Sequence, residues 1–143
     1  MLRRLHPTAG LIGFLTIFTV WVSTVASELS GSAAAIAAVK QALPWGFLLL
    51  VPALAATGAS GFHMAGSSAD PAILRKKLRM KFVAGNGLLL LIPAALWLAS
   101  LASRGSFGGL FYGIQAVELV AGAVNLTLMS LNIRDGLRLT GRI

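Results

Sequence analysis

The sequence contains no cysteine, which excludes disulfide bonds, thiolate metal ligands and cysteine nucleophiles together. Acidic residues are also scarce, because 143 residues include only four Asp and Glu against twelve Lys and Arg. Charged residues make up 11% of the chain, whereas a soluble domain typically has about 25%. Since 57% of the residues are hydrophobic, the composition excludes an ordinary soluble domain and indicates an integral membrane protein.

Four long apolar segments account for this composition. A helix that crosses a membrane needs about 20 mainly apolar residues, and the segments that satisfy this are 8–27, 44–62, 82–102 and 110–133. A basic loop, 63–81, separates the second segment from the third. The four segments use nearly the whole chain, so we expect no second domain. We therefore predict an all-α fold, a single integral membrane four-helix bundle over residues 1–143.

Positive charge is concentrated on one side of this four-span chain. That side holds most of the basic residues, namely Arg3, Arg4, Arg75, Lys76, Lys77, Arg79, Lys81, Arg134, Arg138 and Arg142. Only Lys40 and Arg104 lie on the other side. Cytoplasmic loops carry such an excess, so we expect both termini in the cytoplasm and a multi-pass protein of the inner or plasma membrane. Charge placed at a bilayer surface favours anionic lipid as a partner and argues against nucleic acid.

The aromatic residues agree with this topology. The three tryptophans and the tyrosine all fall in the outer portion of their spans: Trp21, Trp45, Trp97 and Tyr112. Such residues gather at the boundary between lipid headgroups and hydrocarbon. The pattern therefore predicts an aromatic belt at the outer boundary.

The connecting segments give more local expectations. Segment 28–43 is expected to be an outer loop, in which apolar residues at helical spacing are typical of a short helix lying on the membrane surface. Asp70 and Pro71 predict the start of a basic helix over 72–81 that runs into the third span. Pro7 suits the first turn of a helix, so we expect His6 at the start of the first span and not inside a helical turn.

The fourth span carries the strongest internal pattern. Its polar and small residues recur at spacings of three and four, which is one face of a helix: Gln115, Glu118, Gly122, Asn125, Met129 and Asn132. Amides and a carboxylate in a membrane must turn inward and find partners. The pattern therefore predicts that this stripe is buried in the bundle, either as structural hydrogen bonds or as the lining of a cavity or cofactor site.

Glu118 is the least ordinary member of the stripe. A carboxylate inside a bilayer is unfavourable unless it is paired or protonated. The predicted spans contain no basic residue, so we expect Glu118 to be neutral or hydrogen-bonded to Ser23, Thr24 or Trp97. A role as a proton carrier stays open.

The chain has only two histidines, His6 and His63, and the topology places both at the cytoplasmic edge. The same topology brings Asn86, Asn125 and Asn132 toward that end of the bundle. Small residues follow His6, precede His63 and flank Asn86, which allows helices to pack closely or leaves room for a flat macrocycle.

Two imidazoles at one depth on neighbouring helices are what the iron of an axially ligated haem needs. Arg3, Arg75 and Arg79 are candidates to bind the haem propionates by charge-assisted hydrogen bonds. Met64 or Met80 is an alternative axial ligand. Two histidines are too few for a structural zinc site, so we favour haem b held by His6 and His63, with Asn86, Asn125 and Asn132 nearby.

In this architecture, and in His6 and His63, the chain resembles the small four-helix b-type membrane cytochromes. The resemblance implies one haem b, electron transfer, and a quinone or a redox protein as partner. Such cytochromes often bind two haems with four histidines, and this chain supplies two.

Two classes of function follow from the sequence. The leading hypothesis is a membrane haem b protein with one bis-histidine haem near the cytoplasmic face, acting in electron transfer or haem handling. The alternative is a protein without a cofactor, either an accessory or assembly subunit or a small proton-coupled transporter that uses Glu118. A hydrolase is not expected, because no nucleophile–base pair is apparent. Small residues in the second span are consistent with a homodimer.

Overall fold

The protein is described by a computed structural model that covers the backbone of residues 2–141 and the side chains of residues 4–141. The described chain is all-helical: α1 (Leu2–Leu29), α2 (Ala33–Ala65), α3 (Pro71–Asn86), a π-helical turn η1 (Gly87–Leu91), α4 (Ile92–Ser103) and α5 (Gly109–Leu139). Because α3, η1 and α4 follow one another without a break, the chain forms four long rods. Each rod is long and apolar enough to cross a membrane.

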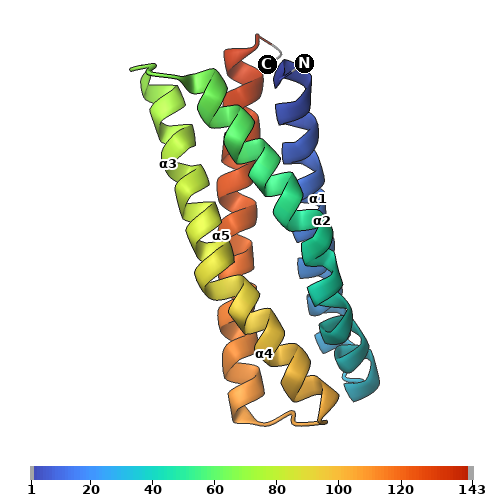
Figure 1. The fold of residues 1–143 in the computed structure, drawn as a ribbon. Helices are drawn as coiled ribbons and strands as arrows, with labels where there is room; N and C mark the ends of the chain where they lie inside the picture. The colour runs from blue at the N-terminus through green and yellow to red at the C-terminus, as the bar shows by residue number, and fades with distance from the viewer. Residues whose placement is uncertain (1, 142–143) are drawn as a thin grey trace.

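The four rods run up and down, and both ends of the chain lie at the same end of the bundle (Figure 1). The turn between α2 and α3 lies there too, with the basic residues of α3 and of the end of α5. We call this the basic end and the opposite one the distal end. The four-helix bundle is therefore confirmed, while the cytoplasmic location of the termini stays a prediction.

The second helix begins earlier than the sequence predicts. The structure contains no separate surface helix within 28–43, because α2 already starts at Ala33 and continues through Pro44. The Ser32 hydroxyl caps this start by accepting a hydrogen bond from the Ala35 amide at 3.3 Å. Proline removes one backbone donor, yet α2 continues through Pro44 as one helix and buries residues on both sides of it, among them Leu43 before it and Ala53 after it.

The expectation for the first helix is also corrected. The helix begins at Leu2, so His6 lies inside a helical turn and not before it. The prediction for the third rod is confirmed, because Asp70 accepts a hydrogen bond from the Ala72 amide at 2.7 Å and α3 starts at Pro71. The π turn lies just before Pro93, whose missing N–H leaves a carbonyl of that turn without its α-helical donor.

Helices α1 and α2 pack closely through small residues. A Cβ atom on Gly13 would lie 3.0 Å from the Leu54 side chain, and one on Gly10 would lie 3.5 Å from that of Thr57. At the basic end a Cβ on Gly61 would lie 2.9 Å from His6. The expected use of small residues for close helix packing is therefore confirmed for this pair.

The aromatic belt is only partly as predicted. Trp45, Trp97 and Tyr112 are exposed on the outside of the bundle. Trp21 instead turns inward, where its indole N–H donates to the Leu119 carbonyl of α5 at 2.9 Å. Its ring lies against Gly122, where a Cβ would be 2.9 Å away.

Two apolar clusters form the core. The distal cluster consists of Ile36, Leu98, Ala102 and Phe111, and the second, toward the basic end, consists of Ile17, Val83 and Met129. Between and beside them the predicted stripe of α5 is buried in full. The bundle therefore encloses polar groups from three helices inside an apolar shell.

Candidate functional site

The most unusual feature of the interior is a buried ion pair between Lys40 of α2 and Glu118 of α5. Lys40 is 0% exposed and Glu118 is 8% exposed. This corrects the prediction that Lys40 lies in an outer loop and that no basic residue reaches Glu118. Among Ser23, Thr24 and Trp97, none donates a hydrogen bond to Glu118 in the described structure. A buried ion pair gains stability only where its desolvation is offset by good geometry and further hydrogen bonds.

Further polar groups surround this pair. The side-chain amide of Gln115 donates to Glu118 Oε2 at 3.1 Å. The other amide atom of Gln115, Oε1, is buried without a hydrogen-bond partner among the described residues, and so is Thr24 Oγ1. Most buried polar atoms in proteins have a partner. Two such atoms beside one carboxylate therefore indicate a place where water or a ligand completes the hydrogen bonds.

A second carboxylate lies near the pair. Glu28, at the distal end of α1, interacts electrostatically with both Lys40 and Glu118, and its Oε1 atom is buried without a partner among the described residues. Lys40 is thus paired with Glu118 and lies within electrostatic range of a second carboxylate, Glu28. We call Thr24, Glu28, Lys40, Gln115 and Glu118 the distal polar cluster.

An internal cavity of about 60 Å³ opens beside Glu118. It extends from there toward the basic end between α1, α2, α4 and α5, and its walls include Thr16, Trp21, Thr24, Phe47 and Gly122. A cavity needs only about 10–15 Å³ to hold one water molecule, provided polar partners are present. The Glu118 carboxylate and the Thr24 hydroxyl supply such partners, so this end of the cavity is suited to one water molecule.

A second polar layer lies nearer the middle of α5. Asn86 Nδ2 donates to Asn125 Oδ1 at 2.8 Å and to the Ala121 carbonyl at 2.9 Å, and Asn125 Nδ2 donates to the Val83 carbonyl at 3.3 Å. These hydrogen bonds link the last turn of α3, in the middle of the third rod, to α5. The amides therefore act here as structural links between helices.

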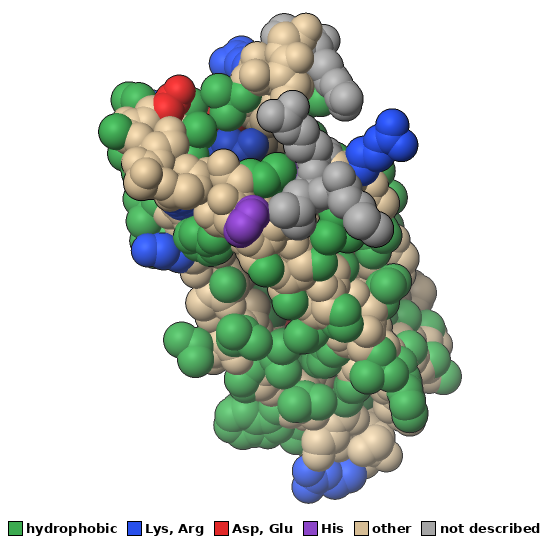
Figure 2. Space-filling model, turned by 45° about the horizontal axis from the view of Figure 1, so that its top comes forward, with side chains coloured by type: hydrophobic (Ala, Val, Ile, Leu, Met, Phe, Trp, Pro, Cys, Tyr) green, Lys and Arg blue, Asp and Glu red, His purple; other side chains and the backbone are tan. Residues whose placement is uncertain are grey.

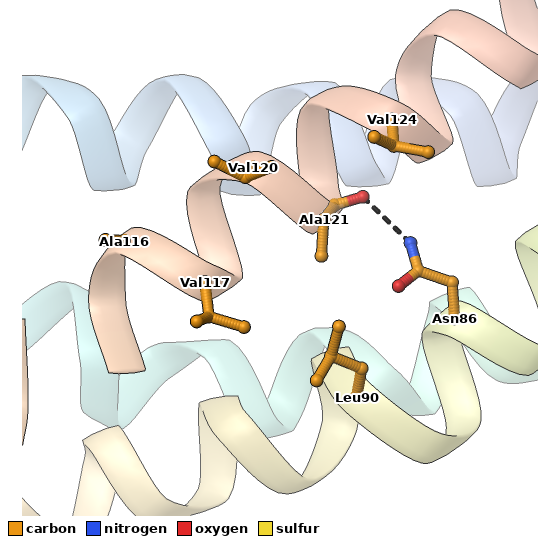
Figure 3. A pocket seen from close by; sticks show the side chains of 7 residues that line it. All are labelled: Asn86, Leu90, Ala116, Val117, Val120, Ala121 and Val124. Carbon is orange, nitrogen blue, oxygen red and sulfur yellow. Dashed lines mark hydrogen bonds between the residues drawn. The ribbon is translucent and has the colours of Figure 1, made fainter. Parts of the chain in front are cut away.

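Asn86 also lines a groove on the outside of the bundle (Figure 3). The groove has a volume of about 470 Å³, and apart from Asn86 its walls are apolar: Leu90, Ala116, Val117, Val120, Ala121 and Val124. Because it is open along its length and apolar, lipid chains can fill it in a membrane.

A third polar layer lies at the basic end. Arg79 Nη1 donates to Asp135 Oδ2 at 2.7 Å and to Asn132 Oδ1 at 3.4 Å. Arg79, predicted to bind a haem propionate, is therefore paired with a carboxylate of the protein. Arg75 is exposed, and the side chain of Arg3 lies outside the described residues.

The two histidines occupy different surroundings. His6 is half-buried, and its Nδ1 lies 3.0 Å from the Thr57 carbonyl and 3.2 Å from Ser60 Oγ. His63 is exposed at the end of α2. Neither histidine lines either of the two cavities described above. The sequence groups both histidines with Asn86, Asn125 and Asn132, whereas the hydrogen bonds divide these residues among separate places. Haem ligation by His6 and His63 stays a prediction.

Sequence reasoning missed Lys40, although a signal for it exists. Ile36, Lys40, Leu43, Phe47, Leu50, Leu54 and Thr57 follow one another at spacings of four and three. This is the same bundle-facing pattern that identifies the stripe of α5. Lys40 thus occupies a position that the period assigns to the interior, whereas the prediction of an outer loop over 28–43 placed it outside.

Comparisons with models of protein families, with curated proteins and with solved structures found no match to this chain.

Proposed function

We propose that the protein is a small proton-coupled membrane transporter in which the Glu118 carboxylate binds the transported proton. The observation that carries the proposal is the buried pair of Lys40 and Glu118 beside a cavity of water size. Ionisable groups inside membrane bundles are costly, and they often mark ion or proton pathways. A purely structural role for the pair does not explain the cavity beside Glu118 or the buried oxygen atoms near the pair that lack a hydrogen-bond partner among the described residues.

In the proposed cycle, the ammonium of Lys40 pairs first with one carboxylate and then with another. When Glu118 takes a proton, it becomes a neutral carboxylic acid and no longer compensates the ammonium of Lys40. The ammonium then pairs with Glu28, the other carboxylate within its electrostatic range. Loss of the proton from Glu118 restores the original pair. The buried ammonium of Lys40 has one carboxylate partner at each stage, which limits the penalty for its desolvation.

The apolar clusters supply the barriers that such a cycle needs. The distal cluster lies between the ion pair and the distal ends of α4 and α5, and the second cluster lies toward the basic end. Both limit entry of water to the pair. In the proposed transporter, motion of these clusters opens the site to one side at a time.

The proposal is tested by proton flux into vesicles. The purified full chain is reconstituted into liposomes that contain a pH-sensitive dye, and a potassium diffusion potential drives proton entry. We expect flux above that of empty liposomes, and a loss of about tenfold or more in Glu118→Gln, because the amide cannot carry the proton. The matched control is Asp135→Asn, which alters the ion pair at the basic end and should change the flux less than about twofold.

Folding is separated from function by a second variant. Glu118→Gln leaves Lys40 without its partner, whereas the double variant Lys40→Met, Glu118→Gln removes both charges and should fold. We expect the double variant to run as the wild-type species in size-exclusion chromatography and still to lack flux. Wild-type flux equal to that of empty liposomes, or full flux in a folded double variant, would contradict the proposal.

Haem b remains a second candidate, supported by the environment of His6. A hydrogen bond from Nδ1–H to the Thr57 carbonyl would fix the tautomer that leaves Nε2 free, which is the arrangement usual for metal-ligating histidines. Electron transfer to a quinone or a redox protein would follow from haem binding. The absorption spectrum of the purified protein after addition of haem tests this: a Soret band that is lost in His63→Ala supports it, and no band rejects it.

A further inference from the structure

We infer that the basic end contains a built binding site for the phosphate group of an anionic lipid, centred on the Lys76 ammonium where α3 meets α5. This inference is independent of the proton-transport proposal. It starts from the packing of Lys76 on Gly136, since a Cβ atom on that glycine would lie 2.9 Å from Lys76 Nζ. The ammonium is therefore held against the backbone of α5.

The ammonium of Lys76 has no hydrogen-bond acceptor among the described residues, whereas its neighbours are paired. Asp135, which interacts electrostatically with Lys76, accepts its side-chain hydrogen bond from Arg79, whose Nη1 lies 2.7 Å from Oδ2, and Arg134 Nε lies 3.7 Å from Oδ1. Lys77 also has a partner, because it donates to the Gly66 carbonyl at 2.7 Å. Lys76 thus keeps free N–H donors in a half-buried position.

The surrounding charge favours an anion. Arg75, Arg79 and Arg134 all interact electrostatically with Asp135, and Lys76 does so as well. Four cations therefore surround one carboxylate. Figure 2 shows this end of the molecule with several blue Lys and Arg side chains around it, and mixed green and tan surface along the bundle below, with a further blue group at the far end. An anion that reaches Lys76 meets donors already held in place by the protein.

The position of the site selects a lipid as the source of the phosphate. Gly136 follows the apolar part of α5 by about one helical turn, so the ammonium of Lys76 lies near the level at which the apolar surface of the bundle ends. A phosphate bound here would sit at the level of lipid headgroups, with the acyl chains of the lipid along the apolar surface of the bundle. Basic pockets between membrane helices bind anionic headgroups in this manner.

The test measures lipid binding to the full chain by native mass spectrometry, with phosphatidylglycerol and phosphatidylcholine titrated in parallel. We expect the wild type to prefer phosphatidylglycerol. Lys76→Met should weaken that binding about tenfold, because a charge-assisted hydrogen bond is lost. The matched control, Lys81→Met, removes an equal charge from an exposed position of the same helix and should change binding less than about twofold.

A pair of glycine variants tests the geometry without a change of charge. Gly136→Ala fills the space where the ammonium rests and should weaken phosphatidylglycerol binding several-fold. Gly113→Ala, also in α5 but with no atom within 4 Å of the added Cβ, should leave binding unchanged. If Lys76→Met and Lys81→Met weaken phosphatidylglycerol binding equally, the effect comes from overall positive charge, and the proposed site at Lys76 is wrong. Equal affinity for both lipids, or displacement of the lipid by an equal concentration of free glycerol phosphate, would overturn the lipid as its ligand.

Discussion

Among the residues that the structure describes, two ion pairs join α5 to another helix, and they differ in their exposure to solvent. In the distal pair the side chains of Lys40 and Glu118 are 0% and 10% exposed. In the pair at the basic end those of Arg79 and Asp135 are 20% and 13% exposed. The pair at the basic end is partly exposed, and further arginines lie near its carboxylate. The distal pair is enclosed, and its carboxylate accepts one more hydrogen bond, from Gln115. The same type of interaction therefore occurs in two settings: near the surface, where it links α3 to α5, and in the interior, where it links α2 to α5 and places two charges largely out of reach of solvent.

Removal of one partner from the buried pair should have the largest effect on stability. We expect Glu118→Gln to lower the free energy of unfolding by about 3–5 kcal/mol, because Lys40 is left buried without compensation. The double variant Lys40→Met, Glu118→Leu should recover most of this loss. Unfolding in mixed micelles, followed by helical circular dichroism, measures both. A double variant no more stable than the single one would show that the pair contributes more than mutual charge compensation.

The glycine beside Trp21 should show the next largest effect. In Gly122→Ala the added Cβ would lie 2.9 Å from the indole, and this ring is held by its hydrogen bond to the Leu119 carbonyl. Overpacking of this kind costs about 1–3 kcal/mol. Gly113→Ala is the control, since its Cβ meets no neighbour within 4 Å. The melting temperatures of the two variants check the prediction, and equal values would contradict the close packing of α1 on α5.

The pair at the basic end should show the smallest effect. We expect Asp135→Asn to lower the free energy of unfolding by about 1 kcal/mol or less, because partly exposed pairs are weak. High salt should remove most of the difference from the wild type, since it screens exposed charges. The same unfolding assay at low and high salt measures this. A loss as large as that of Glu118→Gln would mean that the two pairs are equally enclosed, and the contrast between the two ends would fail.

The sequence predicted much of the fold because hydrophobicity and helical period are local properties. The four helices follow from four apolar segments, and the burial of the α5 stripe follows from its spacing of three and four. The start of α3 follows from Asp70 and Pro71, whose capping chemistry needs only neighbours in sequence. The start of α2 was missed, because the alanine-rich segment before Pro44 is short and only its packing against other helices makes it part of the longer rod.

The candidate site was predicted only in part. Gln115 and Glu118 were identified, since an intramembrane carboxylate and amide are rare enough to stand out. Lys40 was not, because a charge near a predicted loop is normally solvated and its burial depends on a neighbouring helix. For the histidines, the sequence predicted one shared site that the hydrogen bonds among the described residues do not form. His6 Nδ1 contacts the Thr57 carbonyl of α2, whereas His63 is exposed.

By itself, the sequence determined that the chain is an apolar bundle of four helices, with its basic residues at one end and a polar face on the last helix. These properties follow from composition and period along single segments. Only the tertiary structure decided that Glu118 meets Lys40, that Asp135 meets Arg79 and that Trp21 turns onto α5. The physical reason is that partners across helices depend on the rotation and axial shift of whole helices. Those are fixed by packing over the entire length of the bundle.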